Sequence, residues 1–206
     1  MSAVRIVATG VANLASVRAA FARLGLATEV VQDAAAIASA HRLVLPGVGA
    51  FAAGMQRLRE LELVEALRER VVAGRPTLAI CLGMQLCCEG SDESPGVAGL
   101  GVVPGRVRRF GDDGSAAVQV PQLGWNRVDN ALPDGEAGYA YFANSYRLVE
   151  PPPDWQVATA QHGGAFVAAL RRAAVWLCQF HPEISGEFGA RVLTGWLEQS
   201  REEVAC

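Results

Sequence analysis

The sequence predicts an α/β fold with a central, mostly parallel sheet flanked by helices and with antiparallel strands in its second half. In the first half, strand-length apolar runs alternate with amphipathic helical patterns. In the second half, short strand-like runs are separated by glycine and aspartate turns. Of the 206 residues, 51% are hydrophobic and only 7% aromatic, which suits one domain over residues 1–206 with a core rich in Ala, Val and Leu.

Composition limits the classes of function. The 18 Lys and Arg residues against 21 Asp and Glu leave a formal net charge of −3, so neither nucleic acid nor a membrane surface is expected as a partner. The first residues lack a basic region followed by a long apolar core, which predicts a cytoplasmic protein. The 5 cysteines include no Cys-x-x-Cys pair, so neither a disulfide framework nor a zinc site is indicated, and we expect no metal and no cofactor.

The first quarter of the chain has the pattern of a βαβ unit. Each strand candidate is a short apolar run, and the amphipathic helix between the first two is closed by Gly25. The third strand is expected to stop at Pro46, because proline cannot donate to a hydrogen-bond ladder. In order, the elements are strand 4–8, turn 9–13, helix 14–24, strand 28–31, a short helix or loop 33–39 and strand 42–45.

Two glycines flank Val48 in the loop that follows the third strand. Such a loop can turn a backbone N–H outward, as a developing oxyanion beside a nucleophile requires, although taken alone it is more often a plain glycine turn. Residues 54–73 then carry apolar side chains three or four positions apart, which predicts one amphipathic helix whose apolar stripe packs in the core. The helix is expected to end at Gly74.

Residues 76–86 contain the stretch on which the functional prediction depends. An apolar strand, 77–80, leads into Cys81 and a glycine-containing turn, and residues 84–86 begin a helix, which is the pattern of a nucleophile elbow. A helix N-terminus beneath a thiol favours the thiolate and presents free N–H donors. Gly83 suits the turn because little room remains there for a side chain. The alternative is a buried cysteine that ends a core strand, which is the commoner situation for a lone cysteine.

The second half of the chain is expected to be antiparallel. Residues 87–96 are polar and rich in glycine, which predicts a loop beside the cysteine. Beyond this loop, strand-like runs alternate with turns. The runs span residues 100–103, 106–110, 116–120, 125–128, 139–146, 155–161, 166–170 and 175–180, and a final helix covers about 189–200.

The motif His181-Pro-Glu183 directly follows the last of these strands. Proline fixes φ between the two polar residues, so a histidine at a strand end and a glutamate two residues later can project from one rigid turn. The glutamate can then orient the imidazole. A nucleophile, a base and an orienting carboxylate thus occur in the order Cys81, His181, Glu183, which favours covalent catalysis over packing.

These motifs resemble those of the class I, triad-type glutamine amidotransferases, which have a flavodoxin-like fold. Cys81-Leu-Gly-Met-Gln85 and Phe180-His-Pro-Glu183 carry the resemblance. The finer pattern is similar to the glutaminase subunits of imidazole glycerol phosphate synthase, an enzyme of histidine biosynthesis. The matching segments follow one another along essentially the whole chain, at residues 10–17, 46–51, 80–86, 120–126, 141–146 and 179–186.

The resemblance implies hydrolysis of L-glutamine to glutamate and ammonia through a cysteine thioester. Cys81 would attack the side-chain amide, His181 would shuttle the proton and Glu183 would hold the imidazole. The backbone N–H groups of Val48 and Leu82 would form the oxyanion hole. The glutamine site would be lined by Gly49, Gln85, Glu93, Ser145 and Tyr146.

The resemblance also implies a heterodimer with a (β/α)8-barrel cyclase subunit, which uses the ammonia to make imidazole glycerol phosphate and aminoimidazole carboxamide ribonucleotide. Residues that would face this partner or the ammonia passage are Asn13, Gln122, Trp125, Tyr141, Asn144 and Ile184. In the family, histidines often stand at the positions of Gln122 and Asn144, and a lysine at that of Ile184. The two amides keep hydrogen-bonding capacity, whereas Ile184 cannot form a salt bridge.

Two alternative functions are left open by the sequence. The ammonia could feed a sugar-directed or chorismate-directed synthase, although the chorismate type usually has His at the position of Met84. A scaffold that binds a partner without turnover would be favoured by loss of a triad residue, and none is lost. If the Val48 N–H must rotate to complete the oxyanion hole, the isolated chain should be nearly inactive and partner binding should activate it.

Overall fold

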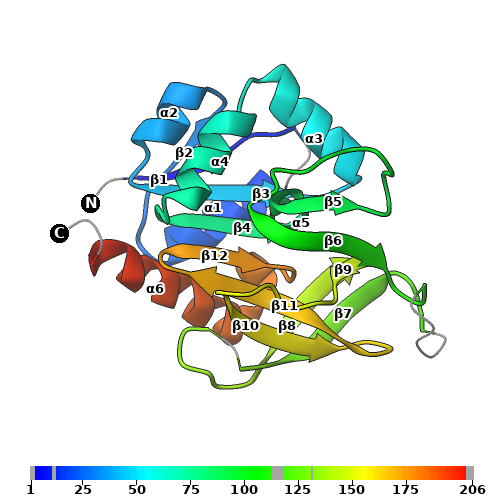
Figure 1. Cartoon of the computed structure of the whole chain (residues 1–206). Helices are drawn as coiled ribbons and strands as arrows, with labels where there is room; N and C mark the ends of the chain where they lie inside the picture. Colours follow the sequence, from blue (N-terminus) through cyan, green and yellow to red (C-terminus); the bar gives the residue numbers. More distant parts are fainter. Residues whose placement is uncertain (1–2, 11–12, 113–117, 131, 203–206) are drawn as a thin grey trace.

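The protein is represented by a computed structural model that describes residues 3–10, 13–112, 118–130 and 132–202. Within these residues, a nine-stranded sheet carries helices on both faces, and a separate three-stranded sheet lies beside it (Figure 1). The predicted α/β architecture is confirmed. No helix in the described ranges combines the length and apolar character that crossing a membrane would require.

One half of the large sheet is parallel. Its strands are adjacent in the order β2, β1, β3, β4, β12, and each neighbouring pair is parallel. The carboxyl ends of parallel strands meet at one edge, which is where open α/β sheets place their ligands. These strands are β1 (Val4–Val7), β2 (Thr28–Val31), β3 (Arg42–Gly47), β4 (Thr77–Cys81) and β12 (Val175–Cys178).

The other half of the large sheet is antiparallel, as predicted. It continues from β12 in the order β11, β10, β7, β8, so that β8 is an edge strand. These strands are β11 (Ala165–Arg172), β10 (Gln156–Gln161), β7 (Gln122–Asp129) and β8 (Gly138–Asn144). Sequence and structure differ at several runs. The runs predicted over 100–103 and 106–110 form one strand, Val103–Arg109, and the run over 139–146 is divided between the strands Gly138–Asn144 and Tyr146–Leu148. Residues 118–120 form no strand, and residues 116 and 117 lie outside the described residues.

The small sheet corrects part of the prediction of a loop over residues 87–96: residues 88–91 form a strand, whereas residues 92–96 form turns. Its strands are β5 (Cys88–Ser91), β6 (Val103–Arg109) and β9 (Tyr146–Leu148), in that order. β5 pairs in parallel with β6, and both Cys88 and Ser91 are fully buried. Gly90 lies against the side chain of Arg106, where an added Cβ would collide. The glycine that suggested a loop therefore lies within a strand, where the side chain of Arg106 packs over it.

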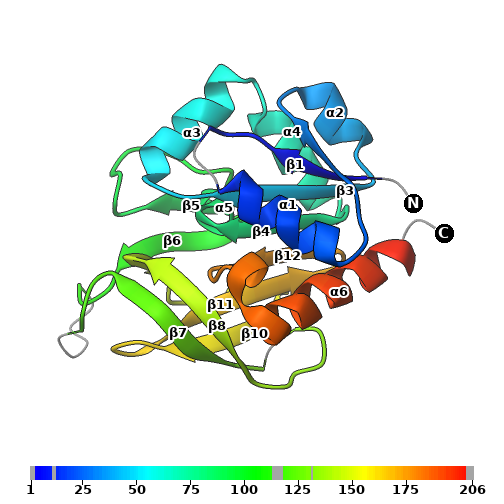
Figure 2. The ribbon, with the colours of Figure 1, turned by 180° about the vertical axis from the view of Figure 1, so that it is seen from behind.

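Helices cover the two faces of the large sheet with two separate apolar cores. The helices α1 (Leu14–Arg23) and α6 (Gly186–Glu202) lie on one face (Figure 2), and α2 (Ala34–Ser39), α3 (Phe51–Glu60) and α4 (Val64–Val72) lie on the other (Figure 1). Residues along each strand alternate between the two cores: Trp176 of β12 joins the core of α1 and α6, and its neighbour Leu177 joins the other.

The single helix predicted over residues 54–73 is in fact two helices. Helix α3 ends in a reversal in which Leu63 N–H donates to Leu58 O at 2.9 Å and Glu62 N–H to Arg59 O at 3.0 Å. Glu62 occupies the left-handed position, with φ of 55°, where glycine usually stands, and Leu58 and Leu63 are both fully buried. The apolar periodicity hid this break because the pairing of these leucines keeps the stripe facing the core.

Strand β3 continues through Pro46 to Gly47, two residues beyond the predicted range 42–45. Its pairing with β1 ends at Val44, while its pairing with β4 continues through Pro46 to Gly47, which lies opposite Cys81. The missing N–H of proline therefore interrupts no ladder on the β1 side. This extension carries the Val48 loop to the side of the cysteine.

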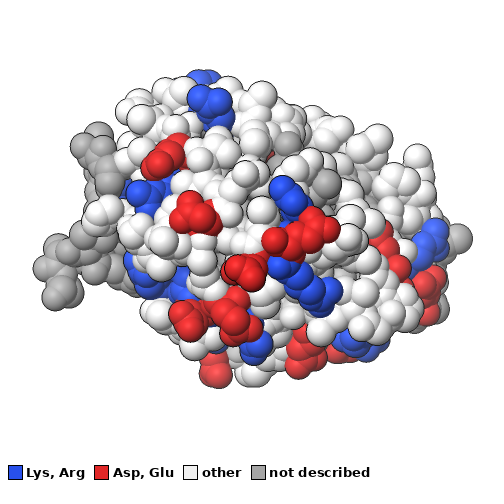
Figure 3. Space-filling view, turned by 90° about the horizontal axis from the view of Figure 1, so that it is seen from above, with Lys and Arg blue, Asp and Glu red and all other residues white. Residues whose placement is uncertain are grey.

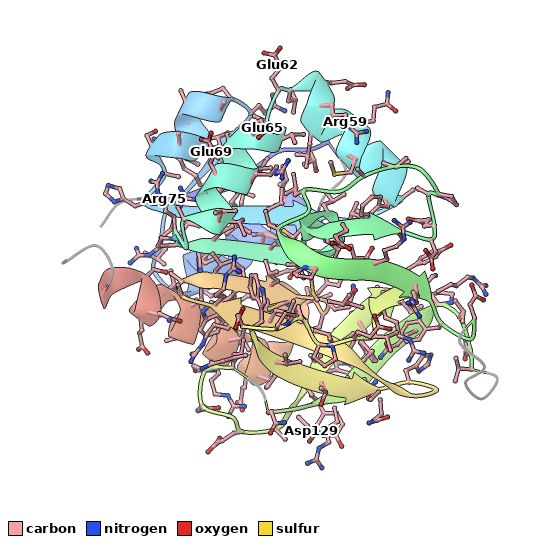
Figure 4. The ribbon with its side chains drawn as sticks, viewed as in Figure 1. Arg59, Glu62, Glu65, Glu69, Arg75 and Asp129 are labelled. Atoms are coloured by element: carbon pink, nitrogen blue, oxygen red, sulfur yellow. The ribbon has the colours of Figure 1, made fainter. Side chains whose placement is uncertain are left out.

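Charged side chains of both signs are mixed on the face over α3 and α4 (Figure 3). Both helices carry ion pairs one turn apart, Arg57 with Glu60 and Arg68 with Glu65. Glu62 and Glu69 project outward at this end of the molecule (Figure 4). The mixture of signs gives this face no single-sign field that would attract a polyanion.

Candidate active site

Cys81 sits on a sharp turn between a strand and a helix. It is the last residue of β4 and the N-cap of α5 (Leu82–Cys87), with φ of 53° and ψ of −111°, a conformation that non-glycine residues adopt only where their surroundings hold them in it. An added Cβ on Gly83 would collide with the carbonyl oxygen of Leu45 in β3. The predicted nucleophile elbow is therefore present in the structure, and Gly83 permits the close approach of α5 to β3.

His181 and Glu183 reach the cysteine because β12 lies beside β4. Cys178, the last residue of β12, pairs with Ile80, so the chain leaves both strands at the same edge. A single 3-10 turn, η1 (Pro182–Ile184), then places Glu183 so that His181 Nδ1 donates to its Oε1 at 2.9 Å. The rigid turn inferred from the sequence is present.

Buried hydroxyl and amide groups fix the backbone of this turn. Ser185 Oγ donates to His181 O at 2.6 Å and accepts from the N–H of Tyr141 at 2.9 Å. The N–H of His181 donates to Tyr141 O at 2.9 Å. The turn is thus attached to the edge strand β8 as well as to β12.

Cys81 and Glu183 determine the charge of the imidazole. Burial is the largest single influence and lowers the pKa of His181. Hydrogen bonds and charges from Cys81 and Glu183 oppose burial and together raise this pKa from 6.5 to about 10. Because Nδ1 faces Glu183, the other ring nitrogen is the one available to Cys81. An imidazolium beside the sulfur favours a nucleophilic thiolate.

A pocket of about 420 Å³ opens above the sulfur. All five residues predicted to bind glutamine line it, together with Cys81 and His181. Glu93 is held there by the N–H of Phe51, which donates to its Oε2 at 2.7 Å, so Glu93 is anchored on the N-terminus of α3. The pocket is lined by Val48, Gly49, Ala50, Cys81, Leu82, Gln85, Glu93, Ala143, Asn144, Ser145, Tyr146 and His181.

Val48 and Leu82, the predicted oxyanion-hole residues, both border this pocket. Gly47 pairs with Cys81 in the β3–β4 ladder, so Val48 follows immediately beside Cys81, and Gly49 has φ of 94°, which only glycine adopts easily. The role of their N–H groups in binding an oxyanion stays a prediction.

The residues predicted to face a partner divide into two groups. Trp125 and Ile184 are 58% and 42% exposed, Asn13 is exposed at the N-cap of α1, and Tyr141 packs its ring edge-on against Trp125. Gln122 and Asn144, in contrast, are each only 5% exposed and lie opposite one another at the start of β7 and the end of β8. Asn144 also lines the pocket, which the sequence did not indicate.

Gln179 is a site residue that received no role from the sequence. It is fully buried between β12 and His181, and its side-chain Nε2 donates to Cys81 Sγ at 3.7 Å. A polar residue that interrupts the apolar run 175–180 was the available signal. Ala50 and Ala143 also line the pocket but have no side-chain chemistry that a sequence could reveal.

The family model of the class-I glutamine amidotransferases matches residues 6–199, which include all the site residues described above. The chain belongs to the class-I glutamine amidotransferase family. Within the described residues, no group of three or more His, Cys, Asp or Glu side chains is arranged to hold a metal ion.

Comparison with curated relatives identifies the subgroup of the family to which this amidotransferase belongs. It is 42% identical over 202 residues to the imidazole glycerol phosphate synthase subunit HisH of Symbiobacterium thermophilum, covering 95% of this chain and 93% of the relative. The HisH subunit of Xanthomonas axonopodis pv. citri is 43% identical over 206 residues, with coverage of 97% and 99%. The chloroplastic imidazole glycerol phosphate synthase hisHF of Arabidopsis thaliana is 41% identical, and the match covers 95% of this chain but 34% of that longer protein. This amidotransferase therefore belongs to the HisH group.

Solved structures support the same fold. A crystal structure of a glutamine amidotransferase aligns with a TM-score of 0.74 at 20% identity, covering 97% of this chain and 100% of the other. A protein of Thermoplasma acidophilum that is assigned to GMP synthase gives a TM-score of 0.69 at 16% identity, with coverage of 100% and 96%.

Proposed function

We propose that this chain is the glutaminase subunit of imidazole glycerol phosphate synthase, which hydrolyses L-glutamine and supplies the ammonia to a cyclase subunit. The observation that carries the proposal is the convergence of Cys81, His181 and Glu183 at the edge of a pocket of about 420 Å³, a size that suits one free amino acid. Membership of the HisH group supports the identity of the synthase.

The reaction proceeds through a thioester. The Cys81 thiolate attacks the carboxamide carbon of glutamine, and the negative charge that develops on its oxygen is bound by the N–H groups of Val48 and Leu82. The carbon–nitrogen bond then breaks as His181 gives its proton to the leaving ammonia. A water molecule, which loses its proton to His181, attacks the thioester, and glutamate leaves as the thiolate is restored.

The pocket residues recognise the rest of the substrate. The carboxylate of Glu93 pairs with the α-amino group of glutamine, since it is the acidic side chain among the pocket-lining residues. The carbonyl oxygen of the Gln85 amide is directed to the substrate, because its Nε2 is already used by Tyr146 O at 3.2 Å and Gln179 Oε1 at 3.0 Å. Gly49, Ser145 and Tyr146 complete the wall.

The ammonia passes to a (β/α)8-barrel cyclase subunit in a cytoplasmic heterodimer. The partner contacts the exposed outer face of β7 and β8, defined by Leu123, Trp125, Tyr139 and Tyr141, together with Asn13 and Ile184. The buried amides Gln122 and Asn144 lie between this face and the pocket, in keeping with a place on the ammonia passage. Glycines on both sides of Val48 give its loop the freedom to reorient when the partner binds.

The decisive experiment measures glutamate and ammonia release from L-glutamine by the full chain, with and without the cyclase subunit. Wild type is expected to turn over rapidly in the complex and slowly alone, and Cys81→Ala to be inactive in both. Wild type no faster than Cys81→Ala in both conditions would establish a non-catalytic scaffold. Turnover without any binding to the cyclase would instead favour an amidotransferase that serves another synthase.

A further inference from the structure

We propose that Gln179 is a positioning residue for the nucleophile: its side-chain amide donates to Cys81 Sγ, and its hydrogen bond to Gln85 connects that contact to the substrate pocket. This inference rests on the proposed glutaminase function but assigns a role to a residue outside the triad, the oxyanion hole and the pocket lining. It also predicts that the reactivity of the Cys81 thiol depends on an amide that lies one hydrogen bond behind the pocket wall.

A main-chain carbonyl and two glutamine side chains form a continuous series of hydrogen bonds that ends at the sulfur of Cys81. Gln85 Nε2 donates to the main-chain oxygen of Tyr146 at 3.2 Å and to Gln179 Oε1 at 3.0 Å. Gln179 Nε2 then donates to Cys81 Sγ at 3.7 Å. Both glutamines are buried, and Gln179 is fully inaccessible to solvent, so water does not compete for these groups.

The direction of each amide follows from the first member of the chain. A main-chain carbonyl can only accept, so the NH2 group of Gln85, and not its oxygen, must face Tyr146 O. The same NH2 group contacts Gln179, which must therefore turn its oxygen toward Gln85. This leaves the NH2 group of Gln179 for the sulfur, where a donor favours the thiolate over the thiol.

The backbone of Gln179 is held independently of its side chain. Its N–H donates to Ala168 O of β11 at 2.8 Å, and it directly follows β12. The side-chain amide thus contributes nothing to the sheet ladder. Its polar atoms contact Gln85 and Cys81. A side chain of similar volume without an N–H donor should therefore leave the fold in place and lower the fraction of Cys81 that is present as thiolate.

Other ionisable groups also act on Cys81 and must be kept constant. His181 lines the same pocket and interacts electrostatically with Cys81, Glu183 acts through His181, and Glu93 and Tyr146 also line this pocket. Because Gln179 carries no charge, its replacement by another uncharged residue changes none of these ionisable groups directly. A shift in the reactivity of Cys81 can then be assigned to the lost donor.

The test measures the rate of Cys81 alkylation by iodoacetamide between pH 5 and 10, which follows the fraction of thiolate. The variants are Gln179→Met, which removes the donor, and Gln179→Asn, which keeps a shorter amide, with Gln56→Met on the exposed surface of α3 as the matched control. Gln179→Met should move the midpoint upward by about one pH unit, with roughly tenfold slower alkylation below it. Gln179→Asn should recover part of this loss, and the Gln56→Met profile should match wild type.

Turnover of glutamine in the complex gives a second readout. Gln179→Met should lower kcat at neutral pH by about tenfold with a smaller change in KM, and the deficit should shrink above the new midpoint. An alkylation midpoint unchanged in Gln179→Met would overturn the inference. If that variant does not fold, Gln179→Leu, which also lacks the donor, takes its place, and an unchanged midpoint in it would overturn the inference equally.

The two proposals fail in different ways. A wild-type complex that releases no ammonia, combined with a shifted midpoint in Gln179→Met, would refute the glutaminase function and leave the contact between Gln179 and Cys81 supported. Normal turnover in wild type, combined with an unshifted midpoint in Gln179→Met, would support the glutaminase function and refute the positioning role of Gln179.

Discussion

The thiol of Cys81 lies in different surroundings from the other described cysteines. Cys87, Cys88 and Cys178 are fully buried, and burial raises the pKa of all three, that of Cys87 to about 12. Cys81 instead borders the pocket and contacts His181. Cys206 lies outside the described residues.

In a Cys206→Ser chain, iodoacetamide at pH 7.5 is therefore expected to label Cys81 at least about a hundredfold faster than the three buried thiols, because only an accessible thiolate reacts. Peptide mass spectrometry over a time course provides the measurement, and labelling after denaturation is the control. Comparable early labelling of Cys87 or Cys178 in the folded chain would contradict this assignment of the nucleophile.

The raised pKa of His181 makes stability depend on pH. The folded value of about 10 exceeds the ordinary value of 6.5, so the folded state binds the proton more tightly. The stabilisation is complete below about pH 6.5 and is lost as the pH rises through about 10. Because Cys81 and Glu183 are the causes of the raised pKa, removing either acceptor should reduce the effect.

We expect the free energy of unfolding of Glu183→Gln to fall less steeply than that of wild type between pH 6.5 and 10. Urea unfolding at intervals across this range measures both slopes. The same variant should lower glutaminase kcat by on the order of 10²- to 10⁴-fold, since the imidazole loses its orienting carboxylate. Equal slopes in the two proteins would show that Glu183 does not hold the proton on His181.

At the scale of elements, the active site depends on how closely α5 approaches β3. An added Cβ at Gly83 would overlap the carbonyl oxygen of Leu45, and Gly47 on the same strand has Leu82 Cβ 3.0 Å from its own ideal Cβ position. The elbow that carries Cys81 lies directly before this contact. Side chains larger than glycine must therefore displace the N-terminus of α5.

Gly83→Ala is expected to destabilise the fold by about 1–3 kcal/mol and to lower glutaminase kcat at least about tenfold. Gly111→Ala is the control, because Gly111 has φ of 87° and nothing within 4 Å of an added Cβ, so it tests backbone strain alone. Urea unfolding and glutamine turnover are measured for both. A Gly83→Ala variant as active as Gly111→Ala would contradict the packing argument.

Arg70 of α4 joins its own helix to the end of α2 and the start of β4, at the opposite edge of the sheet from the active site. Its guanidinium donates to Ile37 O at 3.0 Å, to Ala40 O at 2.9 Å and to Pro76 O at 2.7 Å, and its Nε to Thr77 Oγ1 at 3.1 Å. Burial, the largest influence, lowers the pKa of Arg70 to about 10. The side chain satisfies carbonyls where α2 ends and where β4 begins.

Arg70→Met should reduce the free energy of unfolding by about 3 kcal/mol or more, because several buried carbonyls lose their donor. Arg68→Met on the exposed side of the same helix removes only an ion pair with Glu65 at 3.8 Å and should change it by less than about 1 kcal/mol. Chemical denaturation compares the two. Equal losses would show that the buried network contributes nothing beyond a surface pair.

At the scale of the whole molecule, the outer face of β7 and β8 is the notable exposed apolar surface. Leu123 and Tyr139 are more than half exposed, as is Trp125, whose ring packs edge-on against Tyr141. The added Cβ of Gly186 would lie 3.9 Å from the Trp125 ring, so this face borders the turn that carries Glu183. A partner that covers it would lie next to the catalytic edge.

Trp125→Ala is expected to weaken binding of the cyclase subunit by about 2 kcal/mol, roughly 30-fold in Kd. Val72→Ala should leave Kd unchanged, because Val72 is an exposed apolar residue of α4, a helix that lies apart from β7 and β8 (Figure 1). Isothermal titration calorimetry measures both. Equal affinities for the two variants would remove this face from the interface.

Local pattern predicted most of the architecture, and its failures have physical causes. Alternating strands and helices follow from periodicity, and Gly25 and Gly74 end their helices as predicted. The reversal at Glu62 was missed because a non-glycine residue occupies the left-handed position. The strand β5 was missed because its residues are polar and include a glycine, and they become a strand by pairing with β6, which follows later in the chain.

The sequence by itself determined the fold class, the nucleophile elbow at Cys81 and the turn that pairs His181 with Glu183, because each depends on residues within a few positions of one another. Tertiary structure decided that β12 lies beside β4, which joins the two halves of the triad, and that Gln179 reaches Cys81 and Gln85. The physical reason is that strand order and side-chain contacts across the core depend on packing among segments far apart in the chain. Local propensity depends only on neighbouring residues and therefore does not determine them.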